Sequence, residues 1–593
     1  MQLNSDQRRV VESDGHCLVV ACPGSGKTRV ITTKIGALLD RHPGARICAV
    51  TFTRDAAGEL AHRVQEEIGE TLFKSSCRIG TFHSLAIRQL RNHNQLGKVA
   101  SPAEQLTFLR RAIDMSEPGM EFEDATAIIE AAKGSLEANE AQNHPLYLAY
   151  AKLLGSHNLC DLYDVIRDSV RLMRTGEVRP YPVQFMLVDE FQDTDHIQLE
   201  WVLEHARAGT KITVVGDDDQ SIYSWRGAMG YGGMLEFLEH TGGERITLGI
   251  NYRCHAEILG AADRLIQNNQ ARIEKALVAG RGPGGEVTLE RAGERDDEAG
   301  RAVMRIQADC VPLPEPGPVF RYTVPNGSWA VLARNRRLLD EVEAHLQVKG
   351  ILYYRPPKES FWSRAPQSLL LSLLSALDGG NTSGVDHALS HGLGCRFGRK
   401  RARDVNAKLH PQLAGNFQQL IDGVAPPLEG LMPDEAHFVS EFAGRLTAWA
   451  SQIAAGRYNF AIRAVAAWFG ELEDGNVQRE RIVGAGNTLC RLEGRPSVRV
   501  NAITTVSDNK GRPQGVQLQT MHGSKGLEFN KVWIIGADSA TIPSPKSSNL
   551  DEERRLMYVA MTRAKDRLFI SSITKHATSH YVTEAIGEAV GVL

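Results

Sequence analysis

The chain has 593 residues, of which 42% are hydrophobic and 23% are charged, and its formal net charge is −3. This length predicts several domains, and the composition excludes disordered, collagen-like and disulfide-stapled folds. The 68 Lys and Arg residues are balanced by 71 Asp and Glu residues, so any surface that binds a polyanion must be local. The nine cysteines form no CxxC pair, which argues against a zinc ribbon and favours a reducing compartment.

Membrane attachment is not expected from the sequence. The first residues, MQLNSDQRRV, lack the apolar core of a signal peptide. The most apolar long run, from Ser368 to Leu377, is far shorter than the roughly 20 residues that a membrane helix needs. We expect this run to be a buried helix and the protein to be cytoplasmic, with no membrane partner.

Short apolar strands are predicted in two groups along the chain. The first group lies at residues 17–20, 47–52, 185–188 and 212–215, and each strand is followed by polar, loop-forming residues. Helical patterns separate these strands, which is typical of a parallel α/β sheet whose ligands bind beyond the carboxyl ends of the strands. The second group, at residues 329–333, 516–521, 532–535 and 568–570, predicts another α/β unit.

A mainly helical pattern interrupts each group of strands, so we predict two α/β cores, each carrying a helical insertion. Pro- and Gly-rich stretches at residues 280–285 and 311–327 predict surface loops. The predicted domains are the first core at 1–90 and 181–250, its insertion at 91–180, the second core at 251–360 and 501–593, and its insertion at 361–500.

The strongest local motif is ACPGSGKT at residues 21–28, between a predicted strand and a predicted helix. A phosphate-binding loop requires this context, because Gly24, Ser25 and Gly26 can turn backbone N–H groups toward phosphates at the helix N-terminus. Lys27 would reach the β- and γ-phosphates, and Thr28 would ligate Mg²⁺. The alternative is an ordinary Gly-rich turn, and Ala21 stands where the strict pattern has Gly.

An acidic pair, Asp189 and Glu190, follows the third predicted strand. Asp189 can hold Mg²⁺, and Glu190 can orient or deprotonate an attacking water. Alone, such a pair can be a solvated loop. Its position on the same predicted sheet as the phosphate loop favours nucleotide hydrolysis.

The motifs together resemble those of superfamily 1 DNA helicases of the UvrD/Rep/PcrA type, in the order of that family. The resemblance implies two RecA-like P-loop NTPase cores with parallel sheets, each carrying a mainly helical accessory domain. The motifs are LNSDQRRVV (3–11), ACPGSGKT (21–28), AVTFTRDAAGEL (49–60), GTFHSLAIRQL (80–90), LVDEFQDTD (187–195), VVGDDDQSIYSWRGA (214–228), NYRC (251–254), LQTMHGSKGLEF (518–529) and EERRLMYVAMTRAK (552–565).

The resemblance implies that ATP, with Mg²⁺, is hydrolysed at the cleft between the two cores. Besides Lys27, Asp189 and Glu190, it gives Gln220 the role of γ-phosphate sensor. Arg253 and Arg563 resemble two arginines that the second core contributes, which would couple hydrolysis to closure. Without the resemblance, each of these arginines would be expected in a surface ion pair.

The nucleoside part of ATP is assigned in the same way. Gln7 resembles the glutamine that binds the adenine edge, and its alternative is an exposed polar helix residue. Tyr252 resembles the aromatic residue that stacks on adenine, with Arg29 beside the base. Glu528 resembles the residue that holds the ribose.

A track for single-stranded DNA is also implied. Phe52, Tyr223 and Trp225, with Arg226, resemble the aromatic pockets in which bases stack. Gln220 and Trp225 are only five residues apart, so nucleotide sensing and base binding would share one loop; the alternative makes Tyr223 and Trp225 core aromatics. Contacts to the sugar–phosphate backbone are implied for Thr81, Phe82, His83, Thr520 and His522, and Tyr581 is a further candidate DNA contact.

The resemblance therefore implies an ATP-driven 3′→5′ DNA helicase or translocase that acts on single strands and on single-strand/duplex junctions. One alternative is a non-unwinding single-stranded DNA translocase or a DNA-binding motor subunit of a repair or defence complex, with a protein partner such as a nuclease or repair factor. Another alternative is an RNA motor. The hairpin that usually follows the last motif looks missing or very short at Leu568–Ala585. The basic run Arg396–Arg403 is either a solvated face or a contact for duplex DNA or a partner.

Overall fold

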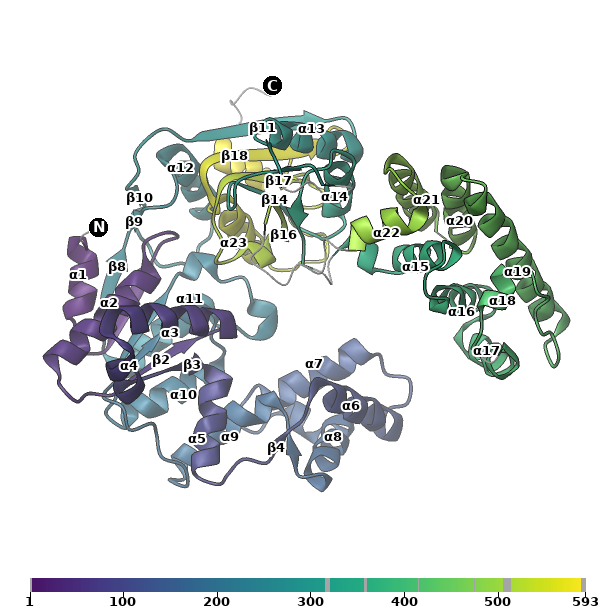
Figure 1. The fold of residues 1–593 in the computed structure, drawn as a ribbon. Coiled ribbons are helices and arrows are strands. Elements are labelled where there is room, and N and C mark those ends of the chain that lie inside the picture. Colours follow the sequence, from purple (N-terminus) through teal and green to yellow (C-terminus); the bar gives the residue numbers. More distant parts are fainter. Residues whose placement is uncertain are drawn as a thin grey trace. The chain divides into compact units, whose positions relative to one another are not determined.

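A computed structural model describes residues 3–314, 320–356, 360–413, 415–473, 475–504 and 514–587. The chain forms two compact units, each with its own sheet (Figure 1). The first unit comprises Met1–Gly285, Lys546–Thr562 and Glu584–Ile586, and the second comprises Glu286–Pro545, Arg563–Thr583 and Gly587–Leu593.

A six-stranded sheet forms the centre of the first unit, with the strand order β3-β2-β6-β7-β1-β8 and only parallel pairs. The four predicted strands are confirmed, whereas the two edge strands were not predicted, because half-exposed edge strands carry fewer apolar residues. The strands are β1 (Cys17–Ala21), β2 (Ile47–Thr51), β3 (Cys77–Thr81), β6 (Phe185–Val188), β7 (Lys211–Gly216) and β8 (Glu244–Leu248).

Helices cover both faces of this sheet, as a parallel sheet requires. Alternate strand residues point to opposite faces, so Val19 and Ala49 belong to one core cluster and Leu18 and Val50 to another. One face packs against α1 (Ser5–Glu12), α2 (Lys27–Arg41) and α3 (Arg54–Ile68); the other packs against α5 (Phe82–Asn92), α9 (Leu162–Arg174), α10 (His196–Arg207) and α11 (Gly230–Thr241).

The first insertion has a small core of its own, which includes Phe108, Ile129 and Leu146. A buried Lys133 ammonium lies 2.6 Å from an oxygen of Asp161, so this cation is paired. The elements here are β4 (Lys98–Val99), α6 (Pro102–Ser116), α7 (Phe122–Lys133), η1 (Glu140–Asn143), α8 (Pro145–Ser156) and β5 (Leu159–Cys160). The short helix α4 (Glu70–Ser76) belongs to the core, where it joins α3 to β3.

Short elements at the carboxyl ends of the first sheet and after it complete the first unit. Residues 251–285 pack with this unit, although the sequence placed them in the second core; the physical reason is their docking on the phosphate loop, described below. The elements are η2 (Phe191–Asp193), η3 (Asp218–Gln220), η4 (Ser224–Arg226), β9 (Ile250–Asn251), α12 (Ala256–Ile266), β10 (Val278–Ala279) and α23 (Leu550–Met561).

The second unit also has a six-stranded parallel sheet, with the order β11-β18-β17-β14-β16-β15. Trp329 and Trp533 both stack on Phe569 inside it, at ring-centroid distances of 5.6 and 5.2 Å. Its elements are β11 (Glu286–Ala292), α13 (Arg295–Gln307), β12 (Val311–Pro312), β13 (Tyr322–Thr323), β14 (Trp329–Ala333), α14 (Leu338–Val348), β15 (Tyr353–Tyr354), β16 (Val516–Thr520), η8 (His522–Ser524), β17 (Phe529–Ile535), β18 (Ala564–Ile573) and α24 (His580–Ile586).

The second insertion is helical, and the predicted buried helix is confirmed as α15, whose Leu370, Leu373 and Leu374 are fully buried. None of the helices in the described ranges combines the length and the apolar composition that crossing a bilayer requires. The insertion contains η6 (Phe361–Ser363), α15 (Gln367–Leu377), α16 (Ser383–Phe397), α17 (Arg399–Leu413), α18 (Gln418–Ile421), α19 (Pro433–Ala454), α20 (Tyr458–Glu471), α21 (Asn476–Arg491) and α22 (Pro496–Thr504).

Candidate functional site

The phosphate loop connects β1 to α2 at the carboxyl edge of the first sheet. Gly24 and Gly26 have φ angles of +64° and +81°, which glycine adopts without strain. Gly26 is the N-cap of α2 and provides no side-chain cap, so the first N–H groups of the helix are not satisfied by a capping side chain. The loop can therefore offer backbone donors and the helix dipole to an anion.

Lys27 begins α2 and reaches the acidic pair at the end of β6. Its Nζ lies 3.2 and 3.3 Å from the two carboxylate oxygens of Glu190. Burial lowers the pKa of Lys27, but the carboxylates of Glu190, Asp217 and Asp189 outweigh this effect and raise the pKa overall. The lysine is therefore a charged ammonium beside the acidic pair at the end of β6.

Asp189 and Glu190 lie where sequence reasoning placed them, at the end of β6. Burial, together with the neighbouring Glu190 charge, raises the pKa of Asp189 to about 7. Glu190 has a φ of 52° and a ψ of 40°, a left-handed conformation that is uncommon for a residue other than glycine. The backbone conformation thus aims the Glu190 side chain at Lys27.

Gln192 positions the carboxylate of Glu190 through a hydrogen bond and was not identified in the sequence analysis. Its Nε2 donates to Glu190 Oε2 at 2.6 Å, and its Oε1 accepts the N–H of Asp217 at 3.0 Å. Since its side chain is fully buried, this amide links the end of β6 to the loop after β7. In the sequence, Gln192 is marked only as a polar residue that follows the acidic pair.

The donor atoms of Thr28 and Asp189 fit Mg²⁺. A hydroxyl and a carboxylate are hard oxygen ligands. The raised pKa of Asp189 reflects its burial and then the neighbouring Glu190 carboxylate, and a bound divalent cation would favour the charged form of Asp189. A second acidic cluster, Asp217–Asp219, is different because Lys275 Nζ already lies 2.7 to 2.9 Å from each of its carboxylates.

Gln220, the predicted γ-phosphate sensor, lies in η3 directly after this cluster. Its side chain is buried, and its Nε2 donates to Asp217 Oδ2 at 2.5 Å. The predicted sensor therefore occupies a fixed orientation in the structure.

The segment Asn251–Arg253 docks on the phosphate loop. Asn251 Nδ2 donates to the carbonyl of Pro23 at 2.6 Å, and the N–H of Tyr252 donates to the carbonyl of Gly24 at 2.9 Å. A Cβ on Gly24 would lie 2.5 Å from the Cβ of Arg253, so only glycine permits this approach. Arg253, which we expected from the second core, therefore lies in the first compact unit.

Arg563 and Glu528 belong to the second unit. Arg563 is almost fully buried, and its guanidinium donates to the carbonyl of Leu527 at 3.1 Å. Glu528 is exposed and lies 2.6 Å from Lys565 Nζ. Glu528 lies in the segment that joins β16 to β17, and Arg563 directly precedes β18.

The residues assigned to the base are brought together around Asn4. Gln7 is only 4% exposed, which excludes the alternative of an exposed helix residue. Its Nε2 donates to the carbonyl of Ser25 at 3.0 Å, and its Oε1 accepts the N–H of Asn4 at 3.0 Å. Asn4 Nδ2 donates to Tyr252 Oη at 2.9 Å, whereas Arg29 is exposed on α2.

An aromatic cluster is formed by half-buried Phe52, directly after β2, and by half-buried Tyr223 and exposed Trp225 in the loop that follows Gln220. Phe52 and Tyr223 have nearly parallel rings with centroids 6.1 Å apart, and Trp225 meets Tyr223 edge-on at 6.4 Å. The guanidinium of Arg226 lies 4.4 Å from the centroid of Trp225. Trp225 is 62% exposed, so the alternative of a core aromatic is wrong for this residue.

The remaining candidate DNA contacts have mixed outcomes. Thr81 caps α5 by accepting the N–H of Ser84, and the neighbouring His83 is half-buried, which lowers its pKa. Phe82 is a correction: it is 3% exposed and packs edge-on against Trp201 in the core.

In the second unit, Thr520 and His522 are both half-buried, at the end of β16 and in η8. Thr520 Oγ1 accepts the N–H of Gly523 at 3.1 Å. Tyr581 is a second correction, since it is fully buried and packs on His580 instead of facing solvent.

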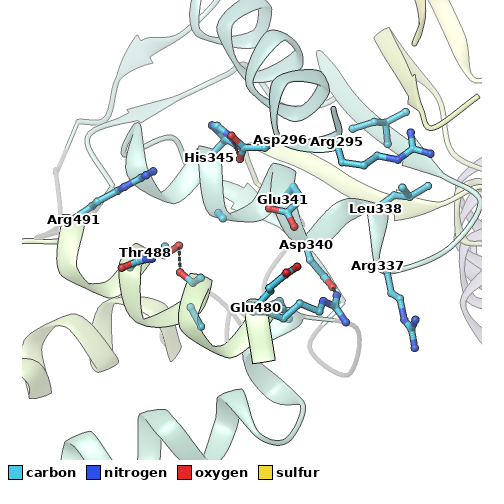
Figure 2. A pocket seen from close by; sticks show the side chains of 17 residues that line it. Arg295, Asp296, Arg337, Leu338, Asp340, Glu341, His345, Glu480, Thr488 and Arg491 are labelled. Atoms are coloured by element: carbon cyan, nitrogen blue, oxygen red, sulfur yellow. Dashed lines mark hydrogen bonds and ion pairs between the residues drawn. The ribbon is translucent and has the colours of Figure 1, made fainter. Parts of the chain in front are cut away.

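Two other features of the second unit carry charge. Arg396, Arg399, Lys400 and Arg403 of the basic run are exposed, while Arg401 pairs with Asp434 and Glu435. A cavity of about 490 Å³ is lined by α13, α14 and α21, and Figure 2 shows arginines and carboxylates intermixed on its wall. This mixture favours neither an anion nor a cation, and the sequence motifs contribute no residue to it.

Comparisons with known proteins agree with this geometry. The family model described as UvrD/REP helicase N-terminal domain matches residues 3–239, and the UvrD-like helicase C-terminal domain matches residues 246–383 and 498–575. ATP-dependent DNA helicase Rep of Escherichia coli K12 is 30% identical over 96% of this chain and 90% of its own length. DNA helicase II of the same strain is 29% identical over 96% and 84%, and ATP-dependent DNA helicase PcrA of Staphylococcus epidermidis is 28% identical over 96% and 83%.

Proposed function

Because this chain belongs to the UvrD/Rep helicase family, we propose that it is an ATP-dependent DNA helicase that moves 3′→5′ along single-stranded DNA. The observation that carries the proposal is one loop of the first unit. It holds the predicted γ-phosphate sensor Gln220 and, five residues later, the exposed Trp225. A change at the nucleotide is thereby transmitted to the base-binding cluster.

Hydrolysis begins with an exchange of ion pairs. Lys27 must leave Glu190 to bind the β- and γ-phosphates, which frees the Glu190 carboxylate to accept a proton from the attacking water. Gln192 keeps that carboxylate in place during the exchange. Thr28 and Asp189 would hold Mg²⁺, which neutralises phosphate charge when it is bound.

The adenosine moiety is assigned to residues around the phosphate loop. Gln7 and Tyr252 lie on either side of Asn4, next to Ser25 and Gly24, and Arg29 stands exposed nearby on α2. The proposal gives Glu528 of the second unit the ribose and gives Arg253 and Arg563 the stabilisation of transferring charge. That the nucleotide is hydrolysed between the two cores is part of the same proposal.

Single-stranded DNA would stack on the cluster of Phe52, Tyr223 and Trp225. Stacking tolerates every base, because each base has a π-face. Arg226 adds a cation beside the same rings, which suits a polyanion. Thr81, His83, Thr520 and His522 remain proposed contacts to the sugar–phosphate backbone.

A second candidate, a translocase that separates strands poorly without a partner, is favoured by one observation. Residues 574–579 form the whole connection from β18 to α24, which leaves no room for a long hairpin at a duplex junction. A nuclease or repair factor would then supply strand separation. The basic run on α16 and α17 remains a predicted contact for duplex DNA or such a partner.

Strand displacement on 3′-tailed and 5′-tailed duplexes tests both candidates. Release of streptavidin from biotinylated single strands, measured in parallel, reports movement without duplex separation. Displacement only from 3′-tailed DNA supports a helicase, and streptavidin release without duplex separation supports the second candidate. Displacement only from 5′-tailed DNA, or ATP turnover stimulated by RNA but not by DNA, would contradict the proposal.

A further inference from the structure

A buried lysine lies beneath the sensor loop of the first unit. Lys275, between α12 and β10, has a fully buried side chain, and its Nζ lies 2.7 Å from oxygens of Asp217 and Asp218 and 2.9 Å from Asp219. Burial lowers its pKa, but the three carboxylates raise the pKa well above its ordinary value. The residue is therefore a permanent ammonium ion 58 positions away in sequence from Asp217.

Asp217 connects this ammonium to the predicted sensor. Its Oδ1 accepts from Lys275 Nζ at 2.7 Å, and its Oδ2 accepts from Gln220 Nε2 at 2.5 Å. The backbone N–H of the same residue donates to Gln192. A carboxylate held at both oxygens cannot rotate, so the direction of the Gln220 amide depends on the position of the lysine.

We propose that Lys275 is a positioning residue for ATP hydrolysis, which fixes the Asp217 carboxylate and thereby holds the Gln220 amide ready for the γ-phosphate. The inference rests on the proposed role of Gln220. It assigns no ligand to the acidic cluster, because the lysine already occupies its centre.

Arg272 provides a matched comparison within the same cluster. It binds Asp219 through two hydrogen bonds of 3.0 and 2.8 Å, so it neutralises the cluster as Lys275 does. Gln220, however, donates to one oxygen of Asp217, and Lys275 holds the other oxygen of that carboxylate. A purely structural role of the cluster predicts similar effects for both cations, whereas a positioning role predicts a kinetic effect of Lys275 alone.

The experiment compares Lys275→Met, Lys275→Gln and Arg272→Met, each with Gln220 intact and with Gln220→Ala. Steady-state ATP turnover with saturating single-stranded DNA gives kcat and KM, and binding of fluorescent ADP reports the rest of the site. We expect Lys275→Met to lower kcat by about tenfold, with KM and the Kd of ADP nearly unchanged, because a misaligned donor loses part of its effect on the transition state. Lys275→Gln, which can still donate to Asp217, should recover part of this loss.

In the Gln220→Ala background, Lys275→Met should have no further effect on kcat, and Arg272→Met should leave kcat within about twofold in either background. Equal, additive losses for Lys275 and Arg272 would overturn the inference. Wild-type turnover of Gln220→Ala would instead refute the sensor assignment on which it rests. If Lys275→Met does not fold by circular dichroism, the comparison of Lys275→Gln with Arg272→Met decides in the same way.

Discussion

Replacing Trp225 by alanine tests the proposed stacking of DNA bases without changing any charge of the protein. The side chain is 62% exposed, and Arg226 covers only part of its ring, so the remaining surface can accept one base. Loss of one stacked base costs about 1–3 kcal/mol, which corresponds to an affinity lowered about 5- to 150-fold. Fluorescence anisotropy of a labelled oligothymidine measures this change directly.

The salt dependence of binding separates stacking from phosphate contacts. Trp225→Ala removes no charge, so the slope of log Kd against log salt concentration should match that of the unaltered protein. Trp225→Phe should retain part of the affinity, because a smaller ring still stacks. Phe460→Ala serves as the control, since this side chain is 65% exposed in the second insertion, outside the aromatic cluster.

The reasoning fails if Trp225→Ala binds oligothymidine with unchanged affinity, or if Phe460→Ala weakens binding as strongly. An altered salt slope would also refute it, because the residue would then act through its neighbours' charges. Binding of ATP without DNA should be the same in all three variants.

Three further predictions follow from the first unit and the end of β18. Lys27→Met should lower ATP turnover by at least about a hundredfold while the circular dichroism spectrum is retained, because this change removes the cation that we propose binds the γ-phosphate. Burial lowers the pKa of His205 to about 4, so the unfolded state binds more protons than the folded state between pH 4 and pH 6.5. The free energy of unfolding therefore falls by about 1.4 kcal/mol per pH unit as the pH drops through that window. The Tm should accordingly fall less between pH 7 and pH 5 in His205→Gln than in the unaltered protein. Because residues 574–579 connect β18 directly to α24, the isolated protein should release streptavidin from a 5′ end of single-stranded DNA faster than it separates a 3′-tailed duplex, and equal rates would contradict this.

Much of the architecture could be predicted because buried strands of a parallel sheet are continuous apolar runs. β1, β6 and β14 were placed to within a residue for this reason. The edge strands β3, β8 and β11 contain charged and polar residues, and their pairing depends on neighbours distant in sequence. Periodicity cannot detect such strands.

The motifs identified which residue types meet at the site, but not which way each side chain points. Phe82 and Tyr581 were expected to contact DNA, yet both pack inward, because an aromatic residue inside a motif carries no signal of its orientation. Gln192 and Lys275 were missed for a different reason. Their importance arises from contacts across the fold, to Glu190 and Asp217, that no local pattern contains.

The contact between Gly24 and Arg253 has a mechanical consequence. A methyl group at position 24 would sit 2.5 Å from the arginine's Cβ, and two hydrogen bonds fasten the same stretch to Pro23 and Gly24. The phosphate loop and the segment Asn251–Arg253 are therefore held so closely that neither can move without the other. If phosphates bind this loop as proposed, any shift of the loop would also displace the segment Asn251–Arg253, so the contact would pass the movement on through the backbone.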